Sequence, residues 1–493
     1  MSLVKINPAD NVAVAAEPIR AGQKIGIGGV YVTANSDMPF GHKIALLDIP
    51  KGGGVIKYSY PIGCATADIA AGEHVHSHNM ATGLGEQLCY TYAPNINPPD
   101  SREPGSFMGF KRNDGKTGIR NEVWIIPTVG CVNSTGEAIA KKAQDLIQGS
   151  VQGVYSFPHP YGCSQLGEDH DNTKKALCGL IRHPNAGGVL VLGLGCENNS
   201  VAEMREMLGD VDENRVKFLI AQECEDEIAG GLALVKQLVN AAKDDIREPV
   251  PTPELIVGLK CGGSDGLSGI TANPLAGAFT DRLTAEGGSA ILTEVPEMFG
   301  AETILMSRCK NEAVFQKTVS LINNFKAYFT SCGQPVYENP SPGNKDGGIT
   351  TLEEKALGCT QKAGTATVVN VLSYGEALRE KGLNLLNSPG NDLVAATALA
   401  ASGAHLILFT TGRGTPFGAP VPTVKISSNT DLFKRKPGWI DFNAGTLVSN
   451  DSMEQLADCF YEYIIALASG KEHTKTGQNG IRDIAIFKTG VTL

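Results

Sequence analysis

The chain begins with short apolar stretches separated by turn residues. None of these stretches in the first ninety residues has the 3.6-residue periodicity of an amphipathic helix, and their lengths are typical of β-strands joined by turns. They cover residues 12–19, 24–33, 42–49, 54–60 and 73–80. We therefore predict a small β module over residues 1–92. Residues 93–107 are rich in proline and polar side chains, the composition of a linker.

After this linker the pattern changes, because apolar runs now alternate with segments of helical length. The predicted strands cover residues 123–130, 153–159, 187–195, 215–222, 255–260, 289–295, 382–389 and 405–412. Most of them are followed by an amphipathic stretch, as residues 187–195 are followed by the helical pattern of residues 199–208. Such alternation predicts parallel sheets with crossover helices.

The predicted architecture is therefore multidomain, with a small N-terminal β module followed by α/β domains with parallel sheets. We place the first α/β domain at residues 108–250 and the second at residues 251–493. The stretch REPVPTPE, residues 247–254, has three prolines and predicts a second, shorter linker.

The net charge of −10 argues against a nucleic-acid partner, because binding to phosphates depends on clustered lysine and arginine. The longest apolar run, GGVLVLGLGC, has about half of the ~20 residues that a membrane helix needs. The N-terminus lacks the apolar core of a signal peptide. We therefore expect a cytoplasmic protein whose 12 cysteines are thiols. A small anionic ligand stays compatible with the charge, because it needs only a local positive site.

Four cysteines stand just past the carboxyl ends of predicted strands. They are Cys131 in PTVGCVNS, Cys163 in PYGCSQLGE, Cys196 in LGLGCENN and Cys261 in LKCGGSDG. In open parallel sheets ligands bind at this edge. Cysteine is also a small residue that is often simply buried. The pattern therefore leaves open whether these thiols pack, line an active-site cavity or bind a metal.

Charged side chains also follow predicted strands. Glu294 and Glu297 suit proton transfer or metal binding, and Arg413, in a glycine-flanked turn, suits a bidentate grip on a carboxylate. The polar loop 338–358 has four glycines and contains Lys345, a composition that suits an oxyanion-binding flap. Charges at strand ends are often only solvated, and that interpretation stays open.

Three of the nine histidines occupy alternate positions in GEHVHSHNM: His74, His76 and His78. In a strand these side chains share one face. Neutral imidazole is the commonest metal ligand, and two imidazoles at this spacing can reach one ion. The alternative is an exposed polar strand face.

Several long motifs resemble the altronate/galactarate dehydratase family, which is related to sulfolactate sulfo-lyase. They are GHKIALLDIPKGGGVIKYSYPIGCATADIAAGEHVHSHN, GIRNEVWIIPTVGCVN, GLGCENN, CGGSDGLSGITANP, LTEVPEMFGAE, NPSPGNKDGGITTLEEKALG and TTGRGTPFG. The resemblance implies that the β module is an SAF-type β-clip domain. It also implies a hydro-lyase that converts D-altronate to 2-dehydro-3-deoxy-D-gluconate in hexuronate (galacturonate) catabolism.

The resemblance further implies dependence on Fe²⁺, with Mn²⁺ as a substitute. Mn²⁺ prefers imidazole and oxygen donors to several thiolates. We therefore expect His74 and His76 to bind the metal, with Cys131, Cys163, Cys196 and Cys261 as the alternative ligands or as cavity thiols.

Dehydration of a sugar acid needs a base for the C2 proton, an acid for the departing C3 oxygen and contacts for the carboxylate. We expect His42 and Glu294 to transfer protons. The expected substrate contacts are Lys43, Ser264, Asp265, Asn344, Lys345 and Arg413. A homodimer is also expected. Two alternatives stay open, namely a dehydratase of another sugar acid such as galactarate and a non-catalytic sugar-acid sensor.

Overall fold

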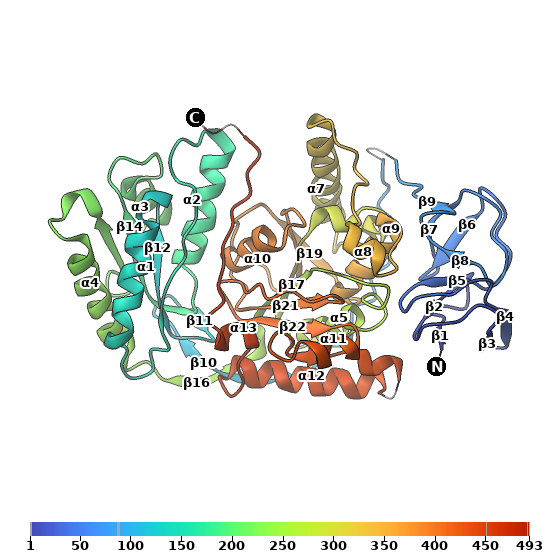
Figure 1. The fold of residues 1–493 in the computed structure, drawn as a ribbon. Coiled ribbons are helices and arrows are strands. Elements are labelled where there is room, and N and C mark those ends of the chain that lie inside the picture. Colours follow the sequence, from blue (N-terminus) through green and yellow to red (C-terminus); the bar gives the residue numbers. More distant parts are fainter. Residues whose placement is uncertain (1, 86–88, 450, 491, 493) are drawn as a thin grey trace.

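The structure, a computed structural model, describes residues 2–85, 89–449, 451–490 and 492. Figure 1 shows three parts: the N-terminal module at one end, the domain with α1 and α4 at the other, and the C-terminal domain between them. The predicted fold class is confirmed, because a β module precedes α/β parts with parallel sheets.

The N-terminal module is built from short antiparallel strands, as predicted. They form a sheet of order β1-β2-β5-β8, a hairpin β3-β4 and a sheet of order β6-β7-β9. The strands are β1 (Leu3–Val4), β2 (Val12–Ala15), β3 (Lys24–Ile27), β4 (Val30–Thr33), β5 (Lys43–Ala45), β6 (Gly54–Lys57), β7 (Tyr60–Ala65), β8 (His74–Val75) and β9 (Met80–Ala81). One of the module's two apolar clusters, around Val12 and Val55, also includes Ala356 and Leu357 of the C-terminal domain. The module therefore shares part of its core with that domain.

The histidine stretch differs from its prediction as one strand. Only His74 and Val75 belong to β8, and a turn separates them from β9. The side chain of Asn79 accepts a hydrogen bond from the His76 N–H at 3.0 Å, and the Asn79 N–H donates back to the His76 carbonyl at 3.0 Å. Asparagine favours such turns because its side chain bonds to nearby backbone. His76 and His78 therefore lie outside the strand.

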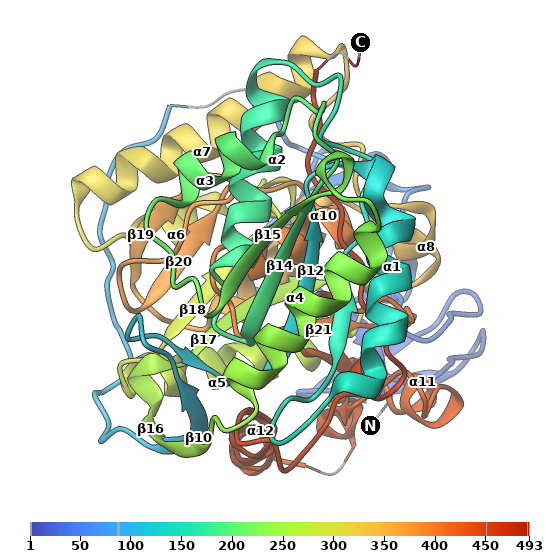
Figure 2. The same cartoon turned by 90° about the vertical axis from the view of Figure 1, so that its left-hand side faces the viewer.

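The second part is a four-stranded parallel sheet of order β13-β12-β14-β15. Its elements are β12 (Glu122–Pro127), α1 (Asn133–Lys142), β13 (Val154–Ser156), α2 (Gly167–Ile181), β14 (Ala186–Gly193), α3 (Val201–Leu208), β15 (Val216–Ile220) and α4 (Glu227–Ala242). Figure 2 shows α1 and α4 on one face of the sheet and α2 and α3 on the other. Because both faces are covered, β14 is buried over most of its length, which explains its continuous apolar run.

A small antiparallel sheet joins the two ends of this domain. It has the order β11-β10-β16 and consists of β10 (Ser106–Lys111), β11 (Thr117–Gly118) and β16 (Arg247–Pro251). The prediction of a linker at residues 247–254 is therefore wrong, because these residues form β16 and a 3-10 helix, η4 (Thr252–Glu254). β16 lies at the edge of its sheet, where prolines such as Pro249 and Pro251 are tolerated.

The C-terminal domain contains a seven-stranded parallel sheet of order β19-β20-β18-β17-β21-β22-β23. The strands are β17 (Ile256–Cys261), β18 (Ser289–Leu292), β19 (Val368–Leu372), β20 (Leu383–Leu386), β21 (Leu406–Thr411), β22 (Thr423–Ser427) and β23 (Phe442–Asn443). The helices are α5 (Ala272–Ala285), α6 (Glu302–Ser307), α7 (Glu312–Ser331), α8 (Pro342–Asp346), α9 (Leu352–Cys359), α10 (Asp392–Ala401), α11 (Thr430–Arg435), α12 (Met453–Ala468) and α13 (Lys475–Gln478).

Two apolar clusters cover the faces of this sheet. Phe279 of α5 and Phe460 of α12 belong to one, while Leu399 of α10 and Leu177 of α2 belong to the other, which joins the two α/β domains. None of the described helices is both long and apolar enough to span a membrane.

Three backbone segments meet where the module touches the C-terminal domain. The Gly266 N–H donates to the Gly347 carbonyl at 2.7 Å, and a Cβ added at Gly266 would lie 1.9 Å from the carbonyl oxygen of Gly41. A side chain at Gly266 would therefore push the module away. This approach brings the module to the loop that follows β17, at the carboxyl edge of the large sheet.

Candidate active site

The side chains expected to carry chemistry gather mainly where the module meets the carboxyl edge of the seven-stranded sheet. His42 lies directly before β5, and His74 lies in β8 on the neighbouring strand. From the other side, α8 and α9 present their polar residues to the module. This is the edge at which open parallel sheets bind ligands.

Four imidazoles form a cluster in the module. The Nδ1 atom of His42 lies 3.0 Å from the Nε2 atom of His74, and the ring of His76 stacks on that of His42 at 5.2 Å between centroids. The rings of His74 and His78 are 5.4 Å apart. The structure therefore brings together His42, His74 and His76, which come from two separate sequence motifs.

Burial keeps His42, His74 and His76 neutral. It lowers the pKa of His74 to about 3, helped by the neighbouring imidazoles of His42, His76 and His78. The pKa values of His42 and His76 are also lowered, in both cases chiefly by burial. Neutral imidazole is the form that binds metal ions.

Backbone carbonyls of α8 hold the outer nitrogens of two of these rings. His42 Nε2 lies 3.2 Å from the carbonyl oxygen of Asp346, and His76 Nε2 lies 3.0 Å from that of Lys345. A ring that donates its Nε2–H to a carbonyl has its lone pair on Nδ1, which in His42 faces His74 Nε2 at 3.0 Å and in His76 faces Ser77 Oγ at 3.0 Å. Metal-binding histidines are commonly oriented in this way. The nitrogens of His42 and His74 are close enough to share one ion, but among the described residues these imidazoles do not bring three ligand atoms within 4.8 Å of one another.

A fully buried carboxylate joins the module to α9. Glu354 accepts hydrogen bonds from Lys43 Nζ and Lys57 Nζ, each at 2.9 Å, and Lys43 also donates to the Gly348 carbonyl at 2.7 Å and to Thr350 Oγ1 at 2.9 Å. Burial by itself raises the pKa of Glu354, but the two ammonium groups outweigh it and lower the pKa to about 2. Lys43, expected at the substrate, therefore has its donors directed to this interface.

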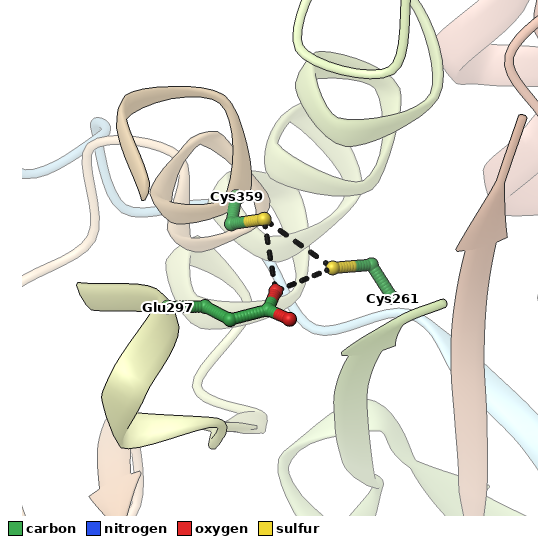
Figure 3. A group of neighbouring side chains, drawn as sticks. All are labelled: Cys261, Glu297 and Cys359. Atoms are coloured by element: carbon green, nitrogen blue, oxygen red, sulfur yellow. Dashed lines mark hydrogen bonds between the residues drawn. The ribbon is translucent and has the colours of Figure 1, made fainter. Parts of the chain in front are cut away.

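In the C-terminal domain, Cys261 at the end of β17 and Cys359 at the end of α9 share one oxygen of Glu297, which belongs to the 3-10 helix η5 (Val295–Met298) (Figure 3). The two sulfur atoms lie 3.0 and 3.1 Å from Glu297 Oε2 and 3.3 Å from each other. Among the described residues, these three form the group of potential metal ligands whose ligand atoms all lie within 4.8 Å of one another.

The surroundings of this group disfavour a cation. Lys355 Nζ lies 2.9 Å from Glu297 Oε1, and lysine ammonium groups, with Lys355 first among them, lower the pKa of Glu297 despite its burial. The hydrogen bond with Cys261, followed by burial, raises the pKa of the Cys359 thiol. Both the S–H protons and the ammonium group thus already satisfy the carboxylate.

Glu294, expected to transfer protons, is fully buried behind this group. Its carboxylate accepts from Lys260, from Lys362 Nζ at 3.2 Å and from the Cys261 N–H at 3.0 Å. Burial, followed by the charge of Glu297, raises the pKa of Glu294. Glu294 is part of a buried network of ion pairs.

Besides Lys43, three of the residues expected to contact substrate are buried, namely Ser264, Asp265 and Asn344. Asn344 donates to the Ser264 carbonyl at 2.8 Å, and Asp265 accepts from Ser268, Ser428 and Asn429. The Ser264 hydroxyl, by contrast, has no hydrogen-bond partner among the described residues, although it is buried. It lines a cavity of about 10 Å³ beside Lys355, roughly the size of one water.

Arg413 and Lys345 are the exposed members of the expected set. A Cβ added at Gly343 of α8 would lie 3.6 Å from Arg413 Nε, so Arg413 borders the loop that carries Lys345. Neither side chain has an ion pair or hydrogen bond to another described residue. Both cations are therefore free to bind an anionic ligand.

The other strand-end thiols lie elsewhere. Cys131, Cys163 and Cys196 follow strands of the second domain, whose β12 and β14 lie at the opposite end of the molecule from the module in Figure 1. All three are exposed, whereas Cys261 is buried. The structure thus separates the thiols of the second domain from the histidines.

Sequence reasoning missed the buried ionic network. Its missed members are Lys57, Lys260, Glu354, Lys355, Cys359 and Lys362. One signal was present, because Lys260 is the one charged residue in the otherwise apolar strand β17. The charged run Glu353–Lys355 in α9 suggests a solvated face instead, although every residue of α9 is buried.

Three family models match successive parts of the chain. They are the altronate/galactarate dehydratase SAF domain at residues 1–83, the second domain of D-galactarate dehydratase/altronate hydrolase at residues 109–243, and the C-terminal domain of D-galactarate/altronate dehydratase at residues 252–492. The chain belongs to the altronate/galactarate dehydratase family, and its N-terminal module is an SAF domain.

Individual relatives are similar along their whole length. Altronate dehydratase of Bacillus subtilis (strain 168) is 55% identical over 500 residues, and altronate dehydratase of Escherichia coli (strain K12) is 53% identical over 497 residues, each covering 100% of both chains. Galactarate dehydratase (L-threo-forming) of Escherichia coli (strain K12) is 32% identical over 98% of this chain and 96% of its own.

The substitution Glu354→Gln tests the buried clamp between module and α9. Removing the carboxylate charge leaves two buried ammonium groups unpaired, so the free energy of unfolding should fall by about 3–5 kcal/mol at pH 7. The native pKa of Glu354 is lowered, so its contribution is complete above the unfolded value near 4.3 and is lost as pH falls towards about 2. The difference between wild type and variant, measured by denaturant titration, should therefore shrink over that range.

The matched control is Glu254→Gln, which removes the carboxylate of an exposed ion pair with Lys381. Its effect should stay below about 1 kcal/mol. Equal effects of the two substitutions would contradict the clamp.

Proposed function

We propose that this protein is a hydro-lyase that dehydrates D-altronate to 2-dehydro-3-deoxy-D-gluconate in hexuronate catabolism. The observation that carries this proposal is the identity of 53–55% over the full length to two altronate dehydratases. Galactarate is the second candidate substrate, and it is favoured less because the galactarate dehydratase is only 32% identical.

The reaction removes a weakly acidic proton at C2 and a poor leaving group at C3. A divalent metal supplies Lewis-acid polarisation of the carboxylate and hydroxyl oxygens when bound. We infer Fe²⁺, with Mn²⁺ as a substitute, held by His74 and His76. The support is the neighbouring His42 nitrogen 3.0 Å from His74 and the carbonyl of Lys345 that orients His76.

Substrate binding is assigned to the exposed cations beside this cluster. Arg413 offers a planar pair of donors for the carboxylate, and Lys345 adds a second positive charge from α8. The unpartnered hydroxyl of Ser264 suits a sugar hydroxyl. The remaining expected residues, Lys43, Asp265 and Asn344, would hold the surrounding loops through the hydrogen bonds they already make.

Proton transfer is assigned to His42, because Glu294 is buried among lysines whereas His42 lies at the cluster. The position of His42 also suits a third metal ligand. Iron content separates these two roles, since a proton carrier can be lost without loss of iron. The cytoplasmic location and the homodimer stay predictions from the sequence.

The proposed activity is tested with the purified full chain and D-altronate. A carbonyl reagent should detect one 2-keto acid per molecule of altronate consumed, at a higher catalytic efficiency than with galactarate. A reversed preference would favour the second substrate. Calorimetric binding of sugar acids without any keto acid would identify a sensor instead of an enzyme.

Arg413→Lys should lower kcat/KM by at least ~100-fold, because lysine keeps the charge but loses the planar pair of donors, worth ~3 kcal/mol. Initial rates at limiting altronate measure the effect. Arg379→Lys is the matched control, since Arg379 is also exposed, lies after β19 and should leave the rate unchanged. Near-normal efficiency of Arg413→Lys would remove Arg413 from the site.

Metal dependence gives a further prediction. Chelation should abolish activity, and Fe²⁺ under reducing conditions should restore it. The double variant His74→Ala/His76→Ala should no longer take up the exchangeable iron, which metal analysis after Fe²⁺ titration measures. His473→Ala, an exposed histidine far along the chain, should behave as wild type. Undiminished iron uptake by the double variant would show that other residues bind the metal.

A further inference from the structure

Every strand of the four-stranded sheet in the second domain is followed by a cysteine. Cys163, Cys131, Cys196 and Cys224 come after β13, β12, β14 and β15, in the order of the strands across the sheet. Because all these strands are parallel, the cysteines stand at one edge. Neighbouring strands are about 4.8 Å apart, so this edge can present several thiols to one ligand.

Hydrogen bonds join the loops that carry three of these thiols. The Gly130 N–H donates to the Tyr161 carbonyl at 2.8 Å, which places the loop of Cys131 beside that of Cys163. The Ser164 N–H donates to Asn198 Oδ1 at 2.8 Å, which places Cys163 beside the loop of Cys196. The three loops therefore form one surface.

The backbone of this surface is strained. Ser164 has φ of 58°, a conformation that is costly for a residue with a side chain. Gly162 has φ of 101°, and a Cβ added there would lie 2.0 Å from the Thr128 carbonyl oxygen. Strain of this kind persists where the surrounding structure maintains it, and it concentrates at functional sites.

Two polar side chains in the loop of Cys196, Glu197 and Asn199, differ in whether their oxygens already have hydrogen-bond partners. Glu197 is turned inward, where its carboxylate accepts from Thr128 Oγ1 at 2.7 Å and from the Gly195 N–H at 2.6 Å, so it is not available as a ligand. The side chain of Asn199 is fully buried, yet its Oδ1 has no hydrogen-bond partner among the described residues. An unpaired buried amide oxygen is costly, so this oxygen is an acceptor available to a donor that reaches it.

Cys224 differs from the other three. It is partly buried, and its thiol donates back to the carbonyl of Ile220 in its own strand at 3.4 Å. Cys131, Cys163 and Cys196 are exposed instead, and Gln222 Nε2 lies 3.5 Å from the sulfur of Cys196. Three thiols are thus free to bind a ligand, and an amide is positioned to donate to one of them.

The three sulfurs are too far apart in this arrangement to be ligands of one ion. They do not form a group with all ligand atoms within 4.8 Å, although the described residues include all three. Ligands of one tetrahedral ion at a metal–sulfur distance of about 2.3 Å lie closer than that. Thiolates that bind different irons of one cluster are farther apart.

We propose that Cys131, Cys163 and Cys196 bind an iron–sulfur cluster at the carboxyl edge of the second domain. The thiols lose their protons on binding iron. A four-iron cluster normally has four cysteine ligands, so three leave one iron open to a small oxygen ligand on this exposed edge. This site is separate from the histidine cluster and does not depend on the proposed function.

The test uses the full chain purified without oxygen, and it measures iron, acid-labile sulfide and the electron paramagnetic resonance spectrum after reduction. Wild type should contain about four sulfides per chain. Cys131→Ala, Cys163→Ala and Cys196→Ala should each lose at least ~80% of the sulfide and the signal, a loss expected when one of three thiolate ligands is removed. Cys224→Ala at the same edge and Cys459→Ala on α12 should keep both.

Labile sulfide that is absent from wild type, or kept by the triple alanine variant, would overturn the assignment. Loss of sulfide in Cys224→Ala would overturn the three-thiol set. Circular dichroism checks folding, and substitutions at exposed thiols should change stability little. The variant His74→Ala/His76→Ala should keep its sulfide. Wild type that contains sulfide but lacks dehydratase activity would refute the proposed function and leave this inference standing.

Discussion

The carboxylate of Glu354 is the point on which the arrangement of module and C-terminal domain depends. It accepts from two lysines of the module in an interface without solvent, and the core around Val55 and Ala356 continues across the same interface. A buried charge without its partners is strongly destabilising, so α9 holds the charge balance only while the module is docked. The position of the histidines over α8 follows from this docking, because His42 directly precedes Lys43.

The arrangement of strands was predictable because burial on both faces leaves a strong signal. β14 and β21 are continuous apolar runs, and they occur where the sequence predicts strands. The failures have local causes. Asn79 forms a turn within the histidine stretch, although the alternating histidines resemble a continuous strand. The strand β16 contains prolines but lies at the edge of its sheet, where a missing backbone N–H removes no hydrogen bond between strands.

The candidate site was predictable only in part. Histidines concentrated in one motif pointed to the cluster, and His42 joined it only through the pairing of β5 with β8. Glu354 and Lys355 carried no signal, since successive charges in a helix resemble a solvated face. The ion pairs join residues that are far apart in the sequence: Lys57 and Glu354, for example, are separated by 297 positions. No local sequence pattern predicts such pairs.

The buried network also explains how a chain of net charge −10 can bind an anion. Lys260 and Lys362 balance Glu294, while Lys355 balances Glu297 and Lys43 and Lys57 share Glu354. Lys260 also pairs with Asp392 at 3.0 Å, so these five lysines face four carboxylates, and Arg413 and Lys345 add two exposed cations. In a medium of low dielectric constant such an excess acts over a longer range than it does in water. These ion pairs and exposed cations therefore have a local excess of positive charge although the whole chain is acidic, and a carboxylate that enters would complete their charge balance.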